Sequence, residues 1–470
     1  MVKNRFNNLT SKEWLPFQKS WFKFSDLQTL YRDNIRFFTQ FNENYTPNVY
    51  FVGATENAKI FETIATDCNC KPVIELDKID KLDFVVIDLL YEFEKTISIE
   101  HYKTVKQKVT DEIKNIYDLL DYRKFVAIFI KNVQSENIFY PFIWDIAKTI
   151  ADILTLKDEK IACLENNQIA QNSDYFKTAG NSFYCLYFRK DEFSQKDFET
   201  QTTNYVLKNE QQPTKLKFET KPTQWFILKP QPRKKNEILH PAKYPEELVD
   251  RFINILTNEN ENVFDPMSGT GSTQISALQN KRNAYGCELS EFFTEIAHKR
   301  LKDFIENNNS HFEFKIINKD ARFVNQNDFP EIDYIITSPP YWDMLNMKGA
   351  ENQAKRKEKG LQLNYSNDSS DLGNISDYKL FVSSLCEIYE NVFKLLKPGR
   401  FATIIVKNIK KKGKNYPLAW DLSAELQKQN MVLLSEQFWC QDDLSIAPFG
   451  YGNTWVSNTF HHYCLTFQKQ

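Results

Sequence analysis

The chain has 470 residues, of which 41% are hydrophobic and 26% charged, and its formal net charge is −2. This composition is typical of a globular protein of two or three domains and excludes a disordered or fibrous chain. No apolar stretch is long enough to cross a membrane, and no apolar core follows the first basic residues, so we expect a cytoplasmic protein without a signal peptide or a membrane partner.

Eight cysteines are spread along the chain, and only Cys68 and Cys70 lie close together. No Cys-x-x-Cys spacing occurs, which argues against a zinc site or a disulfide framework. Most of the cysteines stand in apolar runs, so we expect small core residues and no metal site.

Two distant segments of the chain resemble each other. Residues 124–145 read KFVAIFIKNVQSENIFYPFIWD and residues 400–421 read RFATIIVKNIKKKGKNYPLAWD, with eight of the 22 positions identical. Chance similarity between two β-rich segments is the alternative. However, four further pairs of similar blocks occur in the same order in the two halves of the chain. Those pairs are 48–52 with 262–266, 73–77 with 286–290, 83–91 with 333–341, and 183–188 with 462–467.

Each half alternates short apolar runs with longer amphipathic stretches, which predicts an α/β protein of two doubly wound, Rossmann-like domains in tandem. The first domain is expected over residues 1–200 and the second over 236–470, joined by a linker or extended connection at 201–235 that is rich in Gln, Thr, Lys and Pro. In the second half we predict strands at 262–264, 284–287, 314–317, 334–337 and 401–406, and helices at 246–256, 273–279, 291–306 and 377–396.

A glycine segment follows the first of these strands. A turn of this kind lets the backbone approach a ligand, and the N-terminus of the helix beyond it favours a negative group, such as the methionine carboxylate of S-adenosylmethionine. A tight turn without a ligand is the alternative, and a nucleotide phosphate loop is disfavoured because no Gly-Lys-Ser/Thr follows. The segment reads Asp265-Pro266-Met267-Ser268-Gly269-Thr270-Gly271-Ser272.

Acidic residues end the next two predicted strands. Glu288, followed by Leu289, stands where a carboxylate would accept hydrogen bonds from two ribose hydroxyls. Asp320, followed by Ala321, could accept from an adenine amino group. Either carboxylate alone is more often an ordinary solvated side chain, but both stand at the edge of the sheet where ligands bind.

The segment Thr337-Ser338-Pro339-Pro340-Tyr341-Trp342 ends another predicted strand. Two prolines cannot continue a central strand, and they fix the directions of the carbonyls of Ser338 and Pro339. One side-chain acceptor and one such carbonyl can hold the two hydrogens of an exocyclic base amine, and Tyr341 can stack on a base rotated out of its helix. A proline-kinked loop at the edge of a sheet is the alternative.

Together these segments resemble the DNA amino-methyltransferase family, which covers cytosine-N4 and adenine-N6 enzymes dependent on S-adenosylmethionine. The resemblance spans about residues 222–470 and implies DNA as the substrate. It implies that Ser338, Pro339, Pro340 and Tyr341 form the catalytic tetrapeptide of that family, [Asp/Asn/Ser]-Pro-Pro-aromatic. It further implies that the cofactor is bound by Asp265, Pro266, Met267 (where the family usually has Phe), Ser268, Gly269, Gly271, Ser272, Glu288, Leu289, Asp320 and Ala321, and by His240, Pro241 and Lys243 of a His-Pro-x-Lys-x-Pro block.

The target base stays open between cytosine and adenine. The Ser version of the tetrapeptide is more similar to the cytosine-N4 enzymes, so cytosine N4 is favoured. However, the cofactor segment precedes the tetrapeptide here, which departs from the order that usually accompanies the Ser version. The resemblance also leaves room for a cognate restriction or defence-system protein as a partner.

Residues 343–376 have no counterpart in the first half and are basic in their first part. A basic loop beside the tetrapeptide predicts contacts with phosphates, and a solvated surface loop is the alternative. A second basic run, 410–414, lies near the same edge. The residues expected to contact nucleic acid are Trp342, Lys348, Lys355, Arg356, Lys357 and Lys411.

The first half lacks this chemistry. Asp88-Leu89-Leu90 stands where the second half has Ser338-Pro339-Pro340, and Gly53-Ala54-Thr55-Glu56-Asn57 stands where it has the glycine segment. We therefore expect residues 40–190 to keep the fold without catalysis and to serve as a DNA-binding or structural partner. The alternatives to DNA methylation are an RNA base methyltransferase, which usually carries Asp in place of Ser338, and a non-catalytic DNA-binding subunit.

Overall fold

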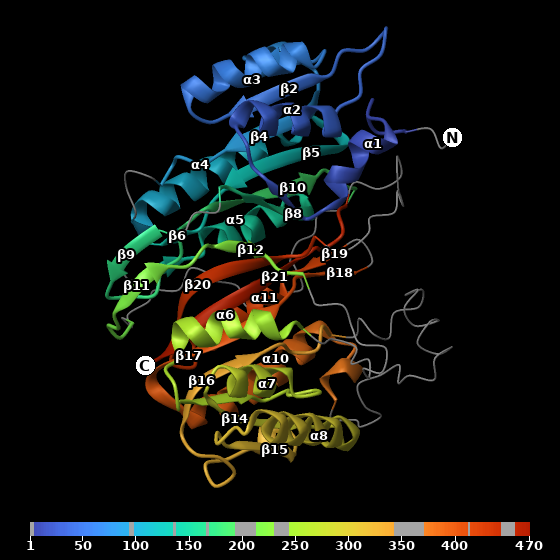
Figure 1. Ribbon diagram of the computed structural model, residues 1–470. Helices are drawn as coiled ribbons and strands as arrows, with labels where there is room; N and C mark the ends of the chain where they lie inside the picture. The colour runs from blue at the N-terminus through green and yellow to red at the C-terminus, as the bar shows by residue number, and fades with distance from the viewer. Residues whose placement is uncertain are drawn as a thin grey trace, which may run out of the picture.

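The computed structural model describes residues 4–93, 98–134, 138–165, 169–192, 213–229, 244–342, 371–411, 414–442 and 456–470. Within these residues the chain forms two large mixed sheets, each flanked by helices, and Figure 1 shows one sheet above the other. None of the helices in the described part of the chain has both the length and the apolar character needed to cross a membrane.

The first sheet has seven strands in the order β1-β8-β10-β5-β4-β2-β3. The interior strand β4 is buried at every position, which explains its nearly continuous apolar run. The strands are β1 (Trp21–Lys23), β2 (Asn48–Val52), β3 (Lys71–Val73), β4 (Leu82–Asp88), β5 (Leu120–Ile130), β8 (Thr155–Cys163) and β10 (Ser182–Arg189), and the longer helices are α2 (Leu27–Phe38), α3 (Thr55–Asp67), α4 (Ile99–Tyr117) and α5 (Phe142–Ala151).

The second sheet has eight strands in the order β12-β20-β21-β17-β16-β13-β14-β15. The strands are β12 (Trp225–Ile227), β13 (Asn262–Asp265), β14 (Asn283–Glu288), β15 (Phe314–Asn318), β16 (Ile332–Thr337), β17 (Leu396–Val406), β20 (Met431–Cys440) and β21 (His461–Lys469). The helices are α6 (Glu246–Leu256), α7 (Ser272–Gln279), α8 (Glu291–Asn308), α10 (Tyr378–Val392) and α11 (Leu418–Gln427).

The five strands and four helices predicted for the second half are confirmed. The main difference lies at Lys397-Pro398-Gly399, between the predicted helix 377–396 and the predicted strand 401–406; these three residues form part of β17. Gly399 there has a φ of 75°, a conformation that favours glycine. All eight cysteines are buried, as their apolar surroundings predicted.

The two sheets correspond strand by strand. Read from β1 and from β12, their orders match up to β3 and β14, and β15 alone has no counterpart. The directions match as well, since β1 and β12 each run parallel to the next strand, whereas β10 and β21 run antiparallel to both of their neighbours.

The halves meet through side chains at corresponding positions. Trp144 and Trp420 stack with ring centroids 6.1 Å apart and planes 13° apart. Trp21 lies 6.4 Å from Trp225 between ring centroids, and the sulfur of Cys163 lies 4.0 Å from that of Cys440. One cluster of buried apolar residues includes members from both halves, so the two sheets share a core.

Short strands complete the fold. Part of the segment expected to connect the domains is itself paired, because β11 (Phe218–Lys221) pairs with β9 (Ile169–Ser173) and β12 joins the second sheet. Each half also has a small hairpin after its long parallel strand. These hairpins are β6 (Val133–Gln134) with β7 (Phe139–Tyr140), and β18 (Ile409–Lys411) with β19 (Lys414–Tyr416).

Candidate active site

The glycine segment links the end of β13 to the start of α7. Gly269 and Gly271 adopt φ values of 53° and 78°, so both occupy the left-handed region that disfavours other residues. A Cβ at Gly271 would also come within 3.2 Å of the Ala297 Cβ. At Gly286 of β14, a Cβ would overlap the Ser268 hydroxyl. The glycines therefore allow the tight turn and its close packing on β14.

Asp265 is a buried carboxylate that accepts hydrogen bonds from residues in and beside the glycine segment. Its side chain is 1% exposed, and one carboxylate oxygen accepts hydrogen bonds from the Thr273 hydroxyl (2.6 Å) and the Tyr244 hydroxyl (2.8 Å). The other oxygen accepts from the Met267 backbone N–H at 3.0 Å. Burial raises the pKa of Asp265 above its usual value. With three partners within the protein, this carboxylate holds the loop in place.

Glu288, at the end of β14, faces the glycine segment. One carboxylate oxygen accepts from the Gly269 N–H at 2.8 Å, and the other accepts from the Ser290 N–H at 2.9 Å. The side chain is half-buried, and burial raises its pKa to about 7. Each carboxylate oxygen has two lone pairs, so both can still accept from a hydroxyl group. Leu289, next in the chain, is also half-buried.

The start of α7 carries an unsatisfied polar group. The Ser272 hydroxyl is buried and has no hydrogen-bond partner among the residues that the structure describes. In contrast, the Ser268 hydroxyl donates to the Asp265 carbonyl at 3.0 Å and accepts from the Gln274 amide at 2.9 Å. Buried polar groups are normally paired, so the lone hydroxyl at a helix start fits a polar ligand group. These residues therefore suit an amino-acid carboxylate and a ribose, as S-adenosylmethionine would present.

Asp320 is placed differently. Both of its oxygens are bound by Arg322, with Nη2 at 2.5 Å from Oδ2 and Nε at 3.1 Å from Oδ1. The carboxylate also accepts from the Arg322 N–H and so caps the short 3-10 helix Ala321–Phe323. Ala321 is buried. A ligand amino group would have to share this carboxylate with the guanidinium.

The tetrapeptide begins directly after β16. The Ser338 hydroxyl lies 3.3 Å from the Tyr341 hydroxyl, and burial raises the pKa of Tyr341. Ser338, Pro340 and Tyr341 are half-buried, whereas Pro339 is buried. The two hydroxyl groups therefore point toward each other beside the fixed proline backbone, at an edge that a ligand can reach.

One further residue, His462, borders the tetrapeptide, and sequence reasoning did not assign it to the site. The His462 ring lies 6.0 Å from the Tyr341 ring between centroids and stacks on Trp439 at 4.3 Å. Lys407 follows β17 and donates to the Gln441 side chain at 3.2 Å, and burial lowers its pKa to about 8. Burial also lowers the pKa of His462. The sheet order β20-β21-β17-β16 brings these strand ends to one edge, and only the unpredicted antiparallel pairing reveals it.

Trp342 is buried, with 3% of its surface exposed. Its ring packs on Tyr378 at 5.4 Å and on Tyr416 at 4.8 Å between centroids, and Lys411 Nζ lies 3.7 Å from its centroid. Its φ of 48° is unusual for a residue other than glycine. This interior position does not support the prediction that Trp342 contacts nucleic acid, whereas the half-buried Lys411 lies above it. His240, Pro241, Lys243, Lys348, Lys355, Arg356 and Lys357 lie outside the described residues.

The corresponding edge of the first half is closed by its own side chains. Asp88 occupies the place of Ser338, is 6% exposed, and accepts from the Tyr31 hydroxyl at 2.5 Å and the Asn57 amide at 3.2 Å. Tyr31, Phe51 and Phe61 pack edge-to-face or tilted against one another with centroids 5.1–5.7 Å apart. The polar group at this strand end is therefore satisfied internally.

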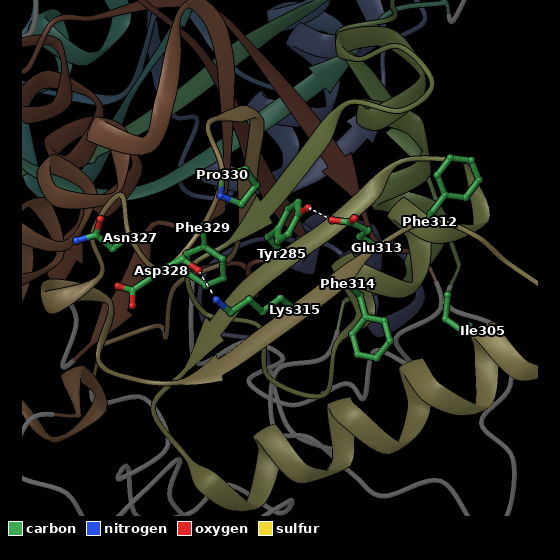
Figure 2. A pocket seen from close by; sticks show the side chains of 10 residues that line it. All are labelled: Tyr285, Ile305, Phe312, Glu313, Phe314, Lys315, Asn327, Asp328, Phe329 and Pro330. Carbon is green, nitrogen blue, oxygen red and sulfur yellow. Dashed lines mark hydrogen bonds between the residues drawn. The ribbon is translucent and has the colours of Figure 1, made fainter.

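A pocket of about 800 Å³ lies elsewhere, along β14 and the edge strand β15 (Figure 2). Tyr285 donates to Glu313 at 3.1 Å and Lys315 donates to the Asp328 carbonyl at 2.6 Å across its wall. None of the predicted site residues lines it. The residues predicted to act together instead gather at the ends of the neighbouring strands β16, β13 and β14.

Comparisons with known proteins place the chain in a family. A family model described as DNA methylase, for N6 and N4 enzymes, matches residues 5–299, more than half of the chain. The orphan methyltransferase M.BamHII of Bacillus amyloliquefaciens is 42% identical over 66 residues, which are 14% of this chain and 25% of that protein. The Type II methyltransferase M.BglII of Bacillus subtilis is 29% identical over 86 residues, 18% of this chain and 24% of that protein. The chain thus spans about a quarter of the length of these relatives in the matched regions. An rRNA methylase structure from Streptococcus thermophilus aligns with 49% of this chain and 99% of its own, at 12% identity and a TM-score of 0.29.

Proposed function

Because the chain belongs to the DNA methylase family of N6 and N4 amino-methyltransferases, we propose that it methylates an exocyclic amine of a base in DNA, with cytosine N4 as the favoured target. S-adenosylmethionine supplies the methyl group in this family. The observation that carries the proposal is the sheet order β16-β13-β14. It brings the tetrapeptide, the glycine segment and Glu288 to the ends of three adjacent strands, so the methyl donor and the base can meet there.

In this proposal the cofactor is held by residues that still have bonding capacity. Glu288 accepts from the two ribose hydroxyls while it keeps its bonds to the Gly269 and Ser290 N–H groups. The Ser272 hydroxyl and the N–H groups at the start of α7 receive the methionine carboxylate. Asp320 contacts the adenine amino group beside Arg322.

Catalysis then depends on the Ser338 side chain and the backbone that the prolines fix. The Ser338 hydroxyl accepts one hydrogen of the base amine and the Pro339 carbonyl accepts the other. This arrangement favours a geometry in which the nitrogen lone pair is no longer delocalised into the ring. Tyr341 stacks on the extruded base, and its hydroxyl, 3.3 Å from Ser338, orients the serine.

The first half is proposed to be a tandem copy that lost its chemistry, with domains at 1–200 and 236–470 joined by 201–235. The matching strand order supports a shared ancestry of the two sheets. The internal pairing of Asp88 with Tyr31 and Asn57 supports the loss of function at that edge. The loop 343–376 and Lys411 are proposed to contact DNA, and the buried Trp342 to anchor the chain next to Tyr341.

An adenine-N6 target is the second candidate. The linear order, with the glycine segment before the tetrapeptide, departs from the arrangement that usually accompanies Ser338 and so weakens the inference of a cytosine target. A cytoplasmic location and a cognate restriction or defence-system protein are further proposals, supported by the Type II methyltransferases among the relatives.

Transfer of a labelled methyl group tests the proposal directly. Purified protein and S-adenosylmethionine are incubated with genomic DNA and, in parallel, with total RNA. We expect label in DNA alone. Label confined to RNA would favour the RNA methyltransferase alternative, and calorimetry without any binding of S-adenosylmethionine would favour the non-catalytic subunit.

A further inference from the structure

The two halves are joined by a buried polar network that methyl transfer itself does not use. Glu159, on β8 of the first half, is 1% exposed. Its two carboxylate oxygens accept from the Asn408 side-chain amide at 3.0 and 3.1 Å, and one also accepts from the Tyr463 hydroxyl at 3.1 Å. Both donors belong to the second half. Without these acceptors the buried amide would keep only its longer contact of 3.4 Å to the Tyr463 hydroxyl, so the Glu159 carboxylate is the main partner that fixes Asn408.

The same contact exists with the halves exchanged. Glu436, on β20 of the second half, accepts from the Asn132 amide at 2.8 Å and from the Tyr184 hydroxyl at 2.6 Å, both in the first half. Glu159 and Glu436 hold equal places in their sheets, since they pair with Leu186 and Leu465 respectively. Each half therefore supplies one carboxylate to the asparagine of the other, as in a two-fold symmetric dimer interface.

Asn408 follows the strand that pairs with the strand before the tetrapeptide. It comes two residues after β17, in which Ile404 is in register with Thr337, the residue before Ser338. The Asn408 side-chain oxygen Oδ1 accepts from the Ala419 N–H at 2.9 Å, which links the start of α11 to the same side chain. Asn408 thus joins the first half to the strand beside the catalytic residues.

The hairpin after Asn408 extends this connection. Its strands β18 and β19 carry Lys411 and Tyr416, which pack on the ring of Trp342, the residue after Tyr341. A second bond from the first half holds the hairpin, because Lys410 donates to the buried Asp158. Burial raises the pKa of Asp158, but Lys410 and Lys160 outweigh it and lower the pKa below its usual value. Asp158 is therefore a carboxylate acceptor for Lys410 at neutral pH.

The corresponding contact, between Glu436 and Asn132, does not lead to a catalytic segment. Asn132 is followed by the hairpin β6–β7, and Gln134 in it donates to the Leu434 carbonyl at 2.7 Å. That hairpin borders the edge where Asp88 stands in place of Ser338 and Glu92 in place of Trp342. Glu159 and Glu436 are thus chemically matched, yet only Glu159 connects to the tetrapeptide.

We propose that Glu159, supported by Asp158, is a positioning residue for the active site in the other half of the chain. Through Asn408 and the β18–β19 hairpin it holds Trp342, and with it Tyr341 and Ser338, in the geometry that the base amine requires. The first half is then needed for turnover although it has no chemistry of its own. This inference rests on the proposed function of the tetrapeptide.

The matched pair Glu159→Leu and Glu436→Leu in the full-length chain tests the inference. Both changes remove a buried acceptor at equal places, so similar losses of thermal stability are expected. Because small displacements of reacting groups lower rates strongly, Glu159→Leu should lower kcat at least about tenfold, whereas Glu436→Leu should change it less than about twofold. The KM for S-adenosylmethionine should change in neither variant. Equal effects on kcat in both variants would overturn the proposal.

A second readout separates this inference from the proposed function. Backbone hydrogen exchange in residues 332–342 and 396–411 should become at least about threefold faster in Glu159→Leu and stay unchanged in Glu436→Leu. If the parent protein methylates nothing, the proposed function fails, and the exchange pattern still decides whether Glu159 orders the segment.

If either Leu variant fails to fold, the pair Glu159→Gln and Glu436→Gln keeps one acceptor oxygen, and the same asymmetry in exchange is expected. Unchanged exchange in residues 332–342 in the folded Glu159 variant would contradict the inference.

Discussion

Ser338 and Asp88 occupy the same place in the two sheets and have opposite surroundings. Ser338 is half-buried and its hydroxyl lies 3.3 Å from that of Tyr341, at an edge open to a ligand. Asp88 is 6% exposed, and its carboxylate is bound by Tyr31 and Asn57. Burial raises the pKa of Asp88 above its usual value. The two sites therefore predict opposite responses to substitution.

The first prediction compares these two positions. Ser338→Ala removes the side-chain acceptor for the base amine, so methyl transfer should fall at least about 100-fold. Asp88→Asn keeps an acceptor for Tyr31 and should leave transfer within about twofold of the parent protein. Both variants should bind S-adenosylmethionine normally in calorimetry. Activity that survives in Ser338→Ala, or that is lost in Asp88→Asn, would show that the division of roles between the halves is wrong.

The second prediction concerns the number of cofactor sites. Glu288 has acceptor capacity for two ribose hydroxyls, whereas the aromatic residues Tyr31, Phe51 and Phe61 fill the first half. Calorimetry should give one molecule of S-adenosylmethionine per chain. Glu288→Ala should weaken that binding at least about tenfold, since it removes a charge-assisted hydrogen bond. The matched control is Glu313→Ala, at the pocket near β15, which should bind as the parent does; a stoichiometry of two would contradict the account.

The sequence was sufficient to predict the parallel strands of the second half and the polar residues at their ends. Its alternating apolar runs predicted the strands that end at Asp265, Glu288 and Thr337, and the spacing put their polar neighbours at one edge. It did not predict the antiparallel pair β20–β21, because a buried strand such as Met431–Cys440 carries Ser435, Glu436 and Gln437 in its middle. The Glu436 carboxylate among them accepts hydrogen bonds from Asn132 and Tyr184 of the first half, a long-range contact that local pattern cannot reveal.

A related limit applies to single side chains. Trp342 follows the tetrapeptide and was expected to contact nucleic acid, yet Tyr378, Tyr416 and Lys411 enclose it. Asp320 was expected to face a ligand, and Arg322, two residues away, binds both of its oxygens. In both cases the side chain also contacts a neighbouring group within the protein, and only the three-dimensional packing reveals that contact.

The third prediction concerns pH. Burial raises the pKa of Glu436 from 4.5 to about 7 in the folded protein. The folded state therefore binds the proton more tightly, so the contribution of Glu436 to stability is complete below pH 4.5 and is lost as the pH rises through 7. The loss is at most about 3 kcal/mol. Glu436→Gln cannot ionise, and its free energy of unfolding in urea should fall less than that of the parent between pH 5 and pH 8. Parallel changes in the two proteins would contradict this assignment.

The fourth prediction concerns DNA contacts by the loop 343–376. Affinity for DNA falls with salt, and each neutralised phosphate makes that dependence steeper. If Lys355, Arg356 and Lys357 each neutralise a phosphate, the triple change to Gln should reduce the magnitude of the slope of log affinity against log salt by about three. A triple change of Lys299 and Lys302 on α8 and Lys394 on the 3-10 helix Phe393–Leu395 to Gln removes the same charge and should leave the slope unchanged. Equal slopes for the loop variant and the parent protein would place the DNA-binding surface elsewhere.

Mass spectrometry of the nucleosides in DNA treated with the protein and S-adenosylmethionine tests the central claim most directly. The tetrapeptide Ser338-Pro339-Pro340-Tyr341 predicts N4-methylcytosine, with no methylated product in DNA treated with the Ser338→Ala variant. N6-methyladenine as the product would contradict the preference for cytosine, but it would agree with an amino-methyltransferase activity. The absence of any methylated base, with S-adenosylmethionine bound and DNA present, would contradict the account as a whole.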